Sequence, residues 1–187
     1  MVENPNEIDL QLWLDQEVIP RQNRLKAKFW KILSDIGNAI DSEGLVKIHS
    51  RSRGVKLSKG NNLLGFPYHV LDLIRDFDQE NGLNIRLLNW FGHGIFLFVL
   101  IGNKHPKAPL NQLKSENWLF DLSETPWDYP EILLNFAATN TPKENEIANS
   151  SFYQWHKPIP IKSASEIKTR ILDELKNLNY LLSEKMG

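Results

Sequence analysis

The chain has 187 residues, a formal net charge of -1 and a hydrophobic content of 41%, values that indicate one globular domain over residues 1–187. It contains no cysteine, which excludes a disulfide framework, a thiolate metal site and a thiol nucleophile. Its first residues are acidic and polar, unlike a secretory signal, and the longest apolar run, residues 95–101, is far below the roughly 20 residues that a membrane-spanning helix needs. We therefore expect a cytoplasmic protein without a membrane partner.

Two helices are predicted near the amino terminus. Residues 7–20 fit a strand or a helix, and we favour the helix because Leu10, Trp13 and Leu14 recur with helical spacing. Residues 25–40 then carry apolar side chains at three- and four-residue steps, which is typical of one helix face. The basic residues of this second helix are expected to face solvent, and they are Arg21, Arg24, Lys26, Lys28 and Lys31. Gly44 is expected to end the helix.

A basic segment, defined here as residues 44–71, contains five lysines and arginines and no acidic residue. Within residues 45–53, basic or chargeable side chains alternate with apolar or hydroxyl ones, and this alternation predicts a strand with one cationic face. Two further lysines are expected to return to the same edge. The candidate anion-binding residues are Lys47, His49, Arg51, Arg53, Lys56 and Lys59.

These cations suit a phosphate-containing ligand, because Lys and Arg form charge-assisted hydrogen bonds with phosphate. Nucleic acid is a second candidate partner, since Tyr68, Trp90 and Phe91 follow in the sequence and aromatic rings stack on bases. The alternative is a solvated sheet face. The pI near 6.5 favours that alternative, because domains that bind nucleic acid usually have a pI above about 9.

Glycine and asparagine dominate residues 59–65, and this composition predicts a loop next to the cationic face. The Walker pattern of a phosphate-binding loop is absent from it. A helix is predicted over residues 67–82, because Val70, Ile74 and Phe77 form an apolar stripe after a proline.

The strongest hairpin pattern in the chain covers residues 83–102. Two apolar segments are joined there by a turn at residues 91–94 that contains two glycines. Residues 95–101 are apolar at every position, which is typical of a strand that is covered on both faces. We therefore place this strand at the centre of the sheet.

The remaining elements complete an α+β fold with a mainly antiparallel sheet. They are a strand at residues 117–122, a short helix at 131–137, a loop at 139–149, an edge strand at 151–161 and a long carboxy-terminal helix. Ser163 and Glu166 form a capping box at the start of that helix. An alternating arrangement of strands and helices around a parallel sheet is the weaker reading.

Three residues are candidates for catalysis, namely His93, His69 and Asp72. His93 lies between two glycines at a turn, where a histidine has room to act as a general acid or base. His69 and Asp72 would lie one helical turn apart, so that His49 or His93 could complete a metal site. No recognised metal signature is present, and polar surface and turn formation explain these residues without any chemistry, so no metal or cofactor is assigned.

Three hypotheses follow for the function. The first is a binding module that recognises a phosphate-containing ligand or nucleic acid through the basic segment. The second is a small enzyme with a cleft near His49, His69 and His93, for which the sequence indicates no reaction. The third is a structural or self-associating protein. Convergence of the histidines with Asp72 would favour the enzyme, an open cationic face would favour the binding module, and an exposed apolar patch would favour self-association.

Overall fold

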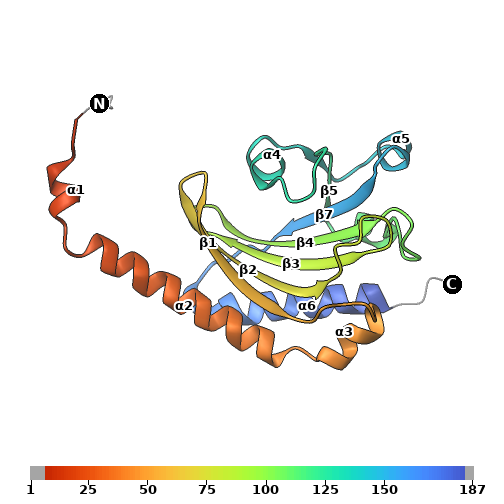
Figure 1. The fold of residues 1–187 in the computed structure, drawn as a ribbon, viewed down its shortest axis with the longest axis horizontal. Coiled ribbons are helices and arrows are strands. Elements are labelled where there is room, and N and C mark those ends of the chain that lie inside the picture. The colour runs from red at the N-terminus through yellow and green to blue at the C-terminus, as the bar shows by residue number, and fades with distance from the viewer. Residues whose placement is uncertain (1–6, 184–187) are drawn as a thin grey trace.

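The computed structural model describes residues 7–183, which form a seven-stranded sheet flanked by helices (Figure 1). Its strand order is β1-β2-β3-β4-β7-β5-β6, and every pairing is antiparallel. The strands are β1 (Lys56–Leu63), β2 (Phe66–Arg75), β3 (Leu83–Trp90), β4 (Gly94–Gly102), β5 (Leu119–Asp121), β6 (Ala138–Thr139) and β7 (Phe152–Pro158). The helices are α1 (Leu10–Leu14), α2 (Val18–Ala39), α3 (Ser42–Ile48), α4 (Tyr129–Leu134), α5 (Glu144–Ala148) and α6 (Ile167–Ser183), with short 3-10 turns η1 (Asn111–Ser115) and η2 (Ala164–Glu166). The predicted α+β fold with a mainly antiparallel sheet is confirmed.

Strands β3 and β4 form the hairpin predicted over residues 83–102. Their register runs without interruption from the pair Leu83 and Ile101 to the pair Trp90 and Gly94. β4 lies between β3 and β7 in the sheet, and most of its side chains on both faces are buried. The prediction that the apolar strand is central is therefore confirmed.

Helices α2 and α6 cover one face of the sheet and enclose the main core with it (Figure 1). Leu33 and Ile36 are the fully buried side chains of α2. The buried stripe of α6 consists of Ile167, Ile171, Leu175, Leu178 and Leu182. The helix follows a capping box in which the Glu166 carboxylate accepts the backbone N–H of Ser163. Both features of the predicted carboxy-terminal helix are confirmed.

Helix α4 packs on the opposite face of the sheet and forms a second, smaller core there. This second cluster consists of Val70, Leu88, Trp90, Phe98, Tyr129 and Ile132. Asp128 starts the helix, because its side chain accepts the backbone N–H of Glu131. The predicted short helix therefore exists, and it begins before residue 131.

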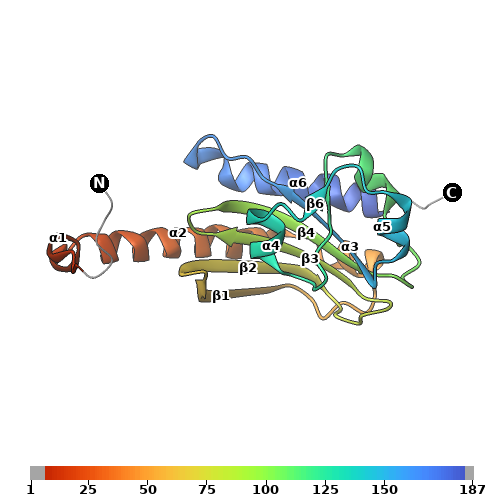
Figure 2. The ribbon, with the colours of Figure 1, turned by 90° about the horizontal axis from the view of Figure 1, so that it is seen from above.

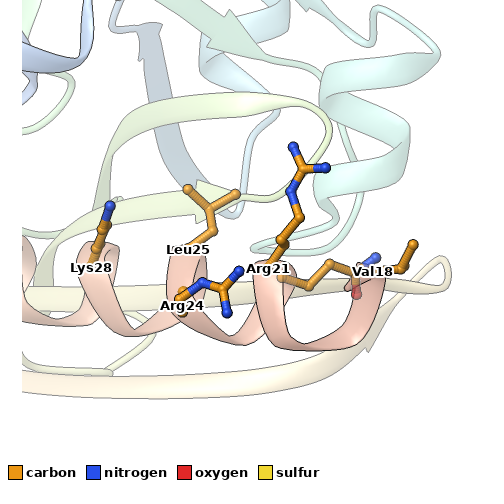
Figure 3. A pocket seen from close by; sticks show the side chains of 6 residues that line it. Val18, Arg21, Arg24, Leu25 and Lys28 are labelled. Atoms are coloured by element: carbon orange, nitrogen blue, oxygen red, sulfur yellow. The ribbon is translucent and has the colours of Figure 1, made fainter. Parts of the chain in front are cut away.

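The amino-terminal part of the chain, residues 8–25, extends beyond the edge of the sheet, and we call it the arm (Figures 1 and 2). It comprises α1, a short connection and the first turns of α2, so the two helices predicted in this region are present. No residue of α1 is buried. A groove of about 540 Å³ runs along the first turns of α2 (Figure 3). It is lined by Val18, Arg21, Gln22, Arg24, Leu25 and Lys28.

The strand predicted over residues 45–53 is wrong, because this stretch begins inside helix α3. Asp41 starts that helix by accepting the backbone N–H of Glu43. Leu45 and His49 are buried four residues apart, which is the spacing of a helix face. Gly44 accordingly lies within α3, and the preceding helix has already ended at Ala39.

The loop over residues 59–65 and the helix over residues 67–82 are also wrong, since these residues form β1, a turn and β2. Irregular pairing makes these two strands difficult to recognise from the sequence pattern. The register shifts in β1 between Gly60 and Leu63 and in β2 between Asp72 and Ile74, so side chains do not alternate regularly between the two faces. The loop predicted over 139–149 contains α5, and the predicted edge strand, β7, lies between β4 and β5.

Among the helices of residues 7–183, none combines the length and the apolar composition that crossing a membrane requires.

Removing one side chain should test the packing of α6 on the sheet. Ile171 is fully buried, and Ile171→Ala should lower the free energy of unfolding by about 2–5 kcal/mol, because it deletes buried methyl groups and leaves a cavity. Urea denaturation of the full chain measures this. Lys176→Ala, on the exposed side of the same helix, is the control and should change stability by less than about 0.5 kcal/mol. Equal effects of the two substitutions would contradict the described packing.

Candidate anion-binding site

The basic segment does not form one cationic face. Lys47 is exposed on α3, and Lys56 pairs with Asp72 on the sheet face that carries α4. Arg53 is exposed, and its backbone is tied to Arg75, which donates a side-chain hydrogen bond to the Arg53 carbonyl at 2.8 Å. The six candidate residues thus have different surroundings, because helix α3 and a turn at residues 50–51 replace the predicted strand.

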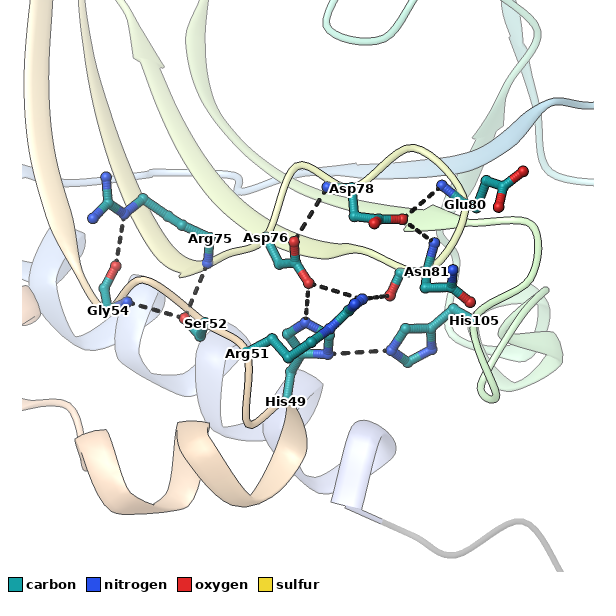
Figure 4. Close-up of polar contacts among 10 residues, drawn as sticks. All are labelled: His49, Arg51, Ser52, Gly54, Arg75, Asp76, Asp78, Glu80, Asn81 and His105. Carbon is teal, nitrogen blue, oxygen red and sulfur yellow. Dashed lines mark hydrogen bonds and ion pairs between the residues drawn. The ribbon is translucent and has the colours of Figure 1, made fainter.

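His49 and Arg51 belong to an internal polar cluster that ties α3 to the turn after β2 (Figure 4). The Nε2 atom of His49 lies 2.7 Å from Oδ2 of Asp76, and an Arg51 Nη atom lies 3.1 Å from the same oxygen. Arg51 also donates to the carbonyl of Asn81 at 2.9 Å. Asp76 therefore neutralises the charge at this end of the segment.

Two histidines of this cluster form a chain of hydrogen bonds. The Lys107 backbone N–H donates to Nδ1 of His105, and Nε2 of His105 lies 3.3 Å from Nδ1 of His49. These contacts are satisfied together when each ring carries a proton on Nε2 and accepts at Nδ1. The proton on His49 then points at Asp76.

The cluster also shifts two pKa values. Burial acts against the charged form of Asp76, but hydrogen bonds from His49 and from the Asp78 backbone, with the charge of Arg51, lower its pKa overall. Burial lowers the pKa of His105 to about 4, and a proton on the neighbouring His49, whenever that ring carries a charge, acts in the same direction.

Lys59 and His69 do come together, in a pocket between α2 and the β1–β2 hairpin. They are paired across the two strands, so both side chains lie on the face that α2 covers. The pocket has a volume of about 350 Å³. We call it the lysine pocket, and it is lined by Asn23, Lys26, Ala27, Trp30, Lys59, Gly60, Asn61, Pro67 and His69. None of these nine residues is acidic.

His69 is the buried polar group of the lysine pocket. Only 3% of the residue is exposed, and its Nδ1 atom has no hydrogen-bond partner within residues 7–183. Its ring meets the edges of Trp30 and Phe91, with centroids 5.6 and 5.2 Å apart. Burial, and then the charges of Lys59 and Lys26, lower the pKa of His69. The two lysines therefore place a positive potential on this ring.

Trp30 and Gly60 shape the walls of the lysine pocket. The Lys59 ammonium lies 5.4 Å from the centroid of the Trp30 ring, within the range of a cation–π contact. A Cβ atom on Gly60 would lie 2.3 Å from the Tyr68 ring, so the glycine admits this ring against β1. Close packing, rather than a phosphate-binding loop, thus accounts for Gly60.

The candidate catalytic residues do not converge. His69 and Asp72 are three residues apart on one strand and lie on opposite faces of the sheet. Asp72 forms a buried ion pair with Arg86, with N–O distances of 2.6 and 3.1 Å. His93 stacks on Trp90, with centroids 3.8 Å apart. Within residues 7–183, no group of three or more potential ligands is placed to hold a metal ion.

Sequence reasoning missed a second buried polar group, made by β5 and β7. Nδ1 of His156 lies 2.5 Å from Asp121, and Gln154 donates to the other oxygen of the same carboxylate at 2.6 Å. Burial raises the pKa of Asp121, although both hydrogen bonds act in the opposite direction. Asp121 and His156 are 35 positions apart in the sequence. Because the paired strands are short, no local pattern predicts that these two residues meet.

Acidification should destabilise the protein through His105. Its native pKa of about 4 is below the ordinary value of 6.5, so between these pH values the unfolded chain binds a proton that the native protein does not. The free energy of unfolding should fall by about 2 kcal/mol from pH 7 to pH 4.5 and stop falling from this cause below pH 4. Urea unfolding across this range measures the loss.

His105→Asn is the matched variant, because it keeps a hydrogen-bonding side chain but does not titrate. Its loss of stability between pH 7 and pH 4.5 should be smaller than that of the wild type. His69, whose pKa is also lowered, contributes equally to both proteins and cancels from the comparison. Identical losses in the two proteins would show that His105 is not the titrating group.

The lysine pocket is thus the place where two cations, an aromatic wall and a buried nitrogen without a partner among residues 7–183 meet. No protein-family model, no curated protein and no solved structure matches this chain.

Proposed function

We propose that the protein is a binding module that holds a phosphate-containing ligand in the lysine pocket. The observation that carries this proposal is the convergence of Lys26 and Lys59 with His69, whose Nδ1 atom has no hydrogen-bond partner in the described part of the chain. Of the anion-binding residues expected from the sequence, Lys59 is the one that lines this pocket. A cytoplasmic location remains a prediction from the sequence.

Charge supports an anionic ligand. Lys26 and Lys59 lie on opposite walls of the pocket, one on α2 and one on β1, and no carboxylate in the lining competes for them. An ammonium group forms its strongest hydrogen bonds with charged oxygens such as those of phosphate. Asn23 and Asn61 add neutral donors and acceptors at the rim. A phosphate group between the two lysines would satisfy both of them at once.

Size and the aromatic wall support a small ligand. A volume of about 350 Å³ lies near the lower limit for small-molecule pockets. Trp30 offers a flat ring on which a planar group of the ligand can stack. These properties favour a small phosphorylated molecule with a ring, or one nucleotide of a single strand, over duplex nucleic acid.

The separation of the histidines supports binding rather than catalysis. His49 is occupied by Asp76 and His105, His69 lies in the lysine pocket, and His93 stacks on Trp90. Asp72 is paired with Arg86 on the other face of the sheet. No member of this set has a carboxylate partner beside a free nucleophile, which an acid–base mechanism of that kind needs.

Calorimetry with pyrophosphate, adenosine monophosphate and a short single-stranded oligonucleotide tests the proposal. At least one probe should bind the full chain at low salt, and Lys26→Ala/Lys59→Ala should weaken binding by at least about tenfold, since two charge-assisted contacts are lost. Raising the salt concentration should weaken binding by the wild type, because salt screens these charges.

Lys47→Ala/Lys56→Ala is the matched control, because it removes two exposed lysines of the basic segment that do not line the pocket. It should leave the affinity within about twofold of the wild type. Equal weakening by the two double variants would indicate binding to surface charge in general. The absence of binding by every probe at low salt would overturn the proposal. Tighter binding of the oligonucleotide than of the mononucleotide would identify a nucleic-acid ligand.

Binding should also depend on the protonation of His69. A bound anion favours the charged imidazolium, so ligand binding should raise the lowered pKa of His69 and the affinity should increase as the pH falls from 7 to 5.5. His69→Gln cannot take up this proton and should lose that increase. Comparing the two proteins with the same probe removes the titration of the phosphate itself. An unchanged pH dependence of affinity in His69→Gln would show that His69 is not the group whose protonation is linked to ligand binding.

A further inference from the structure

The arm exposes more apolar surface than a free helix in water ordinarily carries. Seven of its apolar side chains are between 47% and 74% exposed, and they are Ile8, Leu10, Leu12, Trp13, Leu14, Ile19 and Leu25. Trp13, at 72%, is the most notable, because tryptophan contributes strongly to the stability of interfaces. This many large exposed apolar side chains on one short segment are typical of a surface that another molecule covers.

Charge changes sign at the centre of the arm, and the basic stretch continues beyond the arm along α2. Residues 7–17 contain four acidic side chains and no basic one. Residues 18–31 contain five basic side chains and no acidic one. The two halves are therefore complementary to each other, and the ion pair between Glu17 and Arg24, at 3.3 Å, already joins them at their boundary.

Grooves that can receive apolar side chains lie along α2. The groove of Figure 3 combines Val18 and Leu25 with the aliphatic stems of Arg21, Arg24 and Lys28. A second groove, of about 500 Å³, continues from Leu25 toward the turn between β3 and β4. Its apolar lining includes Leu25, Phe29, Phe91, Phe96, Ile159 and Ile161. Leu25 lines both grooves, so the two grooves meet at this residue.

We propose that two copies of this chain associate through their arms, which lie antiparallel across a two-fold axis. In this arrangement α1 of each copy packs along α2 of the other, with Trp13 and Leu14 against the surface around Leu25. The apolar side chains of each arm leave water, and the grooves of the other copy are filled. The pairing is isologous, because each copy gives and receives the same contacts.

The charge pattern selects both the partner and the direction. A parallel pair of arms would place acidic halves against each other and basic halves against each other, whereas an antiparallel pair places each acidic half against a basic one. A second copy of the chain carries the same acidic and basic halves, so it provides the complementary charges without another partner. The lysine pocket uses Asn23, Lys26, Ala27 and Trp30, while the groove uses Val18, Arg21, Leu25 and other residues on a different side of α2, so both surfaces can be used together.

Sedimentation velocity of the full chain from 1 to 100 µM tests the proposal. The wild type should form a dimer, and Trp13→Ala/Leu14→Ala should raise the dissociation constant at least tenfold. Phe77→Ala/Leu122→Ala is the matched control, because these two side chains are each 43% exposed and lie outside the arm. The control should dimerise like the wild type. A wild type that stays monomeric at 100 µM, or arm and control variants that behave alike, would overturn the proposal.

Charge exchange tests the direction of pairing. Glu7→Lys/Glu17→Lys makes residues 7–17 neutral, because Asp9 and Asp15 remain, and Arg21→Glu/Arg24→Glu lowers the charge of residues 18–31 from +5 to +1. Each variant alone should dimerise at least tenfold more weakly than the wild type, because the attraction between the facing halves is lost or reduced at both ends. A mixture of the two should form a heterodimer more tightly than either variant associates with itself, since an unchanged acidic half and an unchanged basic half meet again at one end. Failure of the mixture to associate would refute the antiparallel arrangement. Circular dichroism of each variant separates lost association from lost helix, and ligand binding by the monomeric variants keeps this test independent of the lysine pocket.

Discussion

The apolar character of both faces of β4 is the constraint on which the architecture depends. A strand with no polar face cannot border water, so the sheet needs a cover on each side. Helices α2 and α6 supply one cover, and α4 with its preceding loop supplies the other. Because α2 is held against the sheet by Leu33 and Ile36, its earlier turns lie over the ends of β1 and β2. The lysine pocket is a consequence of that placement.

Patterns that repeat over many residues predicted the fold well. The stripe of α6 continues for more than four turns, and the apolar run of β4 has few interpretations other than a buried strand. Both elements carry long stretches in which local preference and tertiary packing agree. The α+β class followed from these elements and from the hairpin, and it did not depend on the segments that were interpreted wrongly.

Short or irregular segments misled the interpretation for identifiable reasons. Residues 45–53 alternate in polarity by coincidence, while capping by Asp41 and the burial of Leu45 make the first part a helix. In β2, a shift of register between Asp72 and Ile74 breaks the two-residue period, so that Val70 and Ile74 belong to different core clusters although they are four residues apart. Tertiary pairing overrides local pattern in such places, and the pairing partner is invisible in the segment itself.

The candidate site shows the same limit at the level of single residues. Lys59 and His69 were both singled out from the sequence, but for different sites, because β1 and β2 were not recognised as a pair. Lys26 was assigned to solvent, since nothing in the helix pattern indicates which turn lies over the hairpin. The pairing of Asp121 with His156 likewise arises from the order of the strands. The sequence indicated which residues could bind an anion. Which of them lie together depends on the register of β1 with β2 and on the position of α2 against the sheet.

Part of the basic segment forms β1, which lies at an edge of the sheet. It is the last strand on its side of the sheet, so one row of its backbone N–H and C=O groups has no neighbouring strand. An open edge of this kind invites uncontrolled addition of strands from other chains. Lysines at Lys56 and Lys59, a run of Gly60-Asn61-Asn62 and a local irregularity all oppose such growth, since charge repels a similar edge and the distortion spoils its register. The composition on which the proposed ligand recognition rests thus also opposes the addition of strands at this edge.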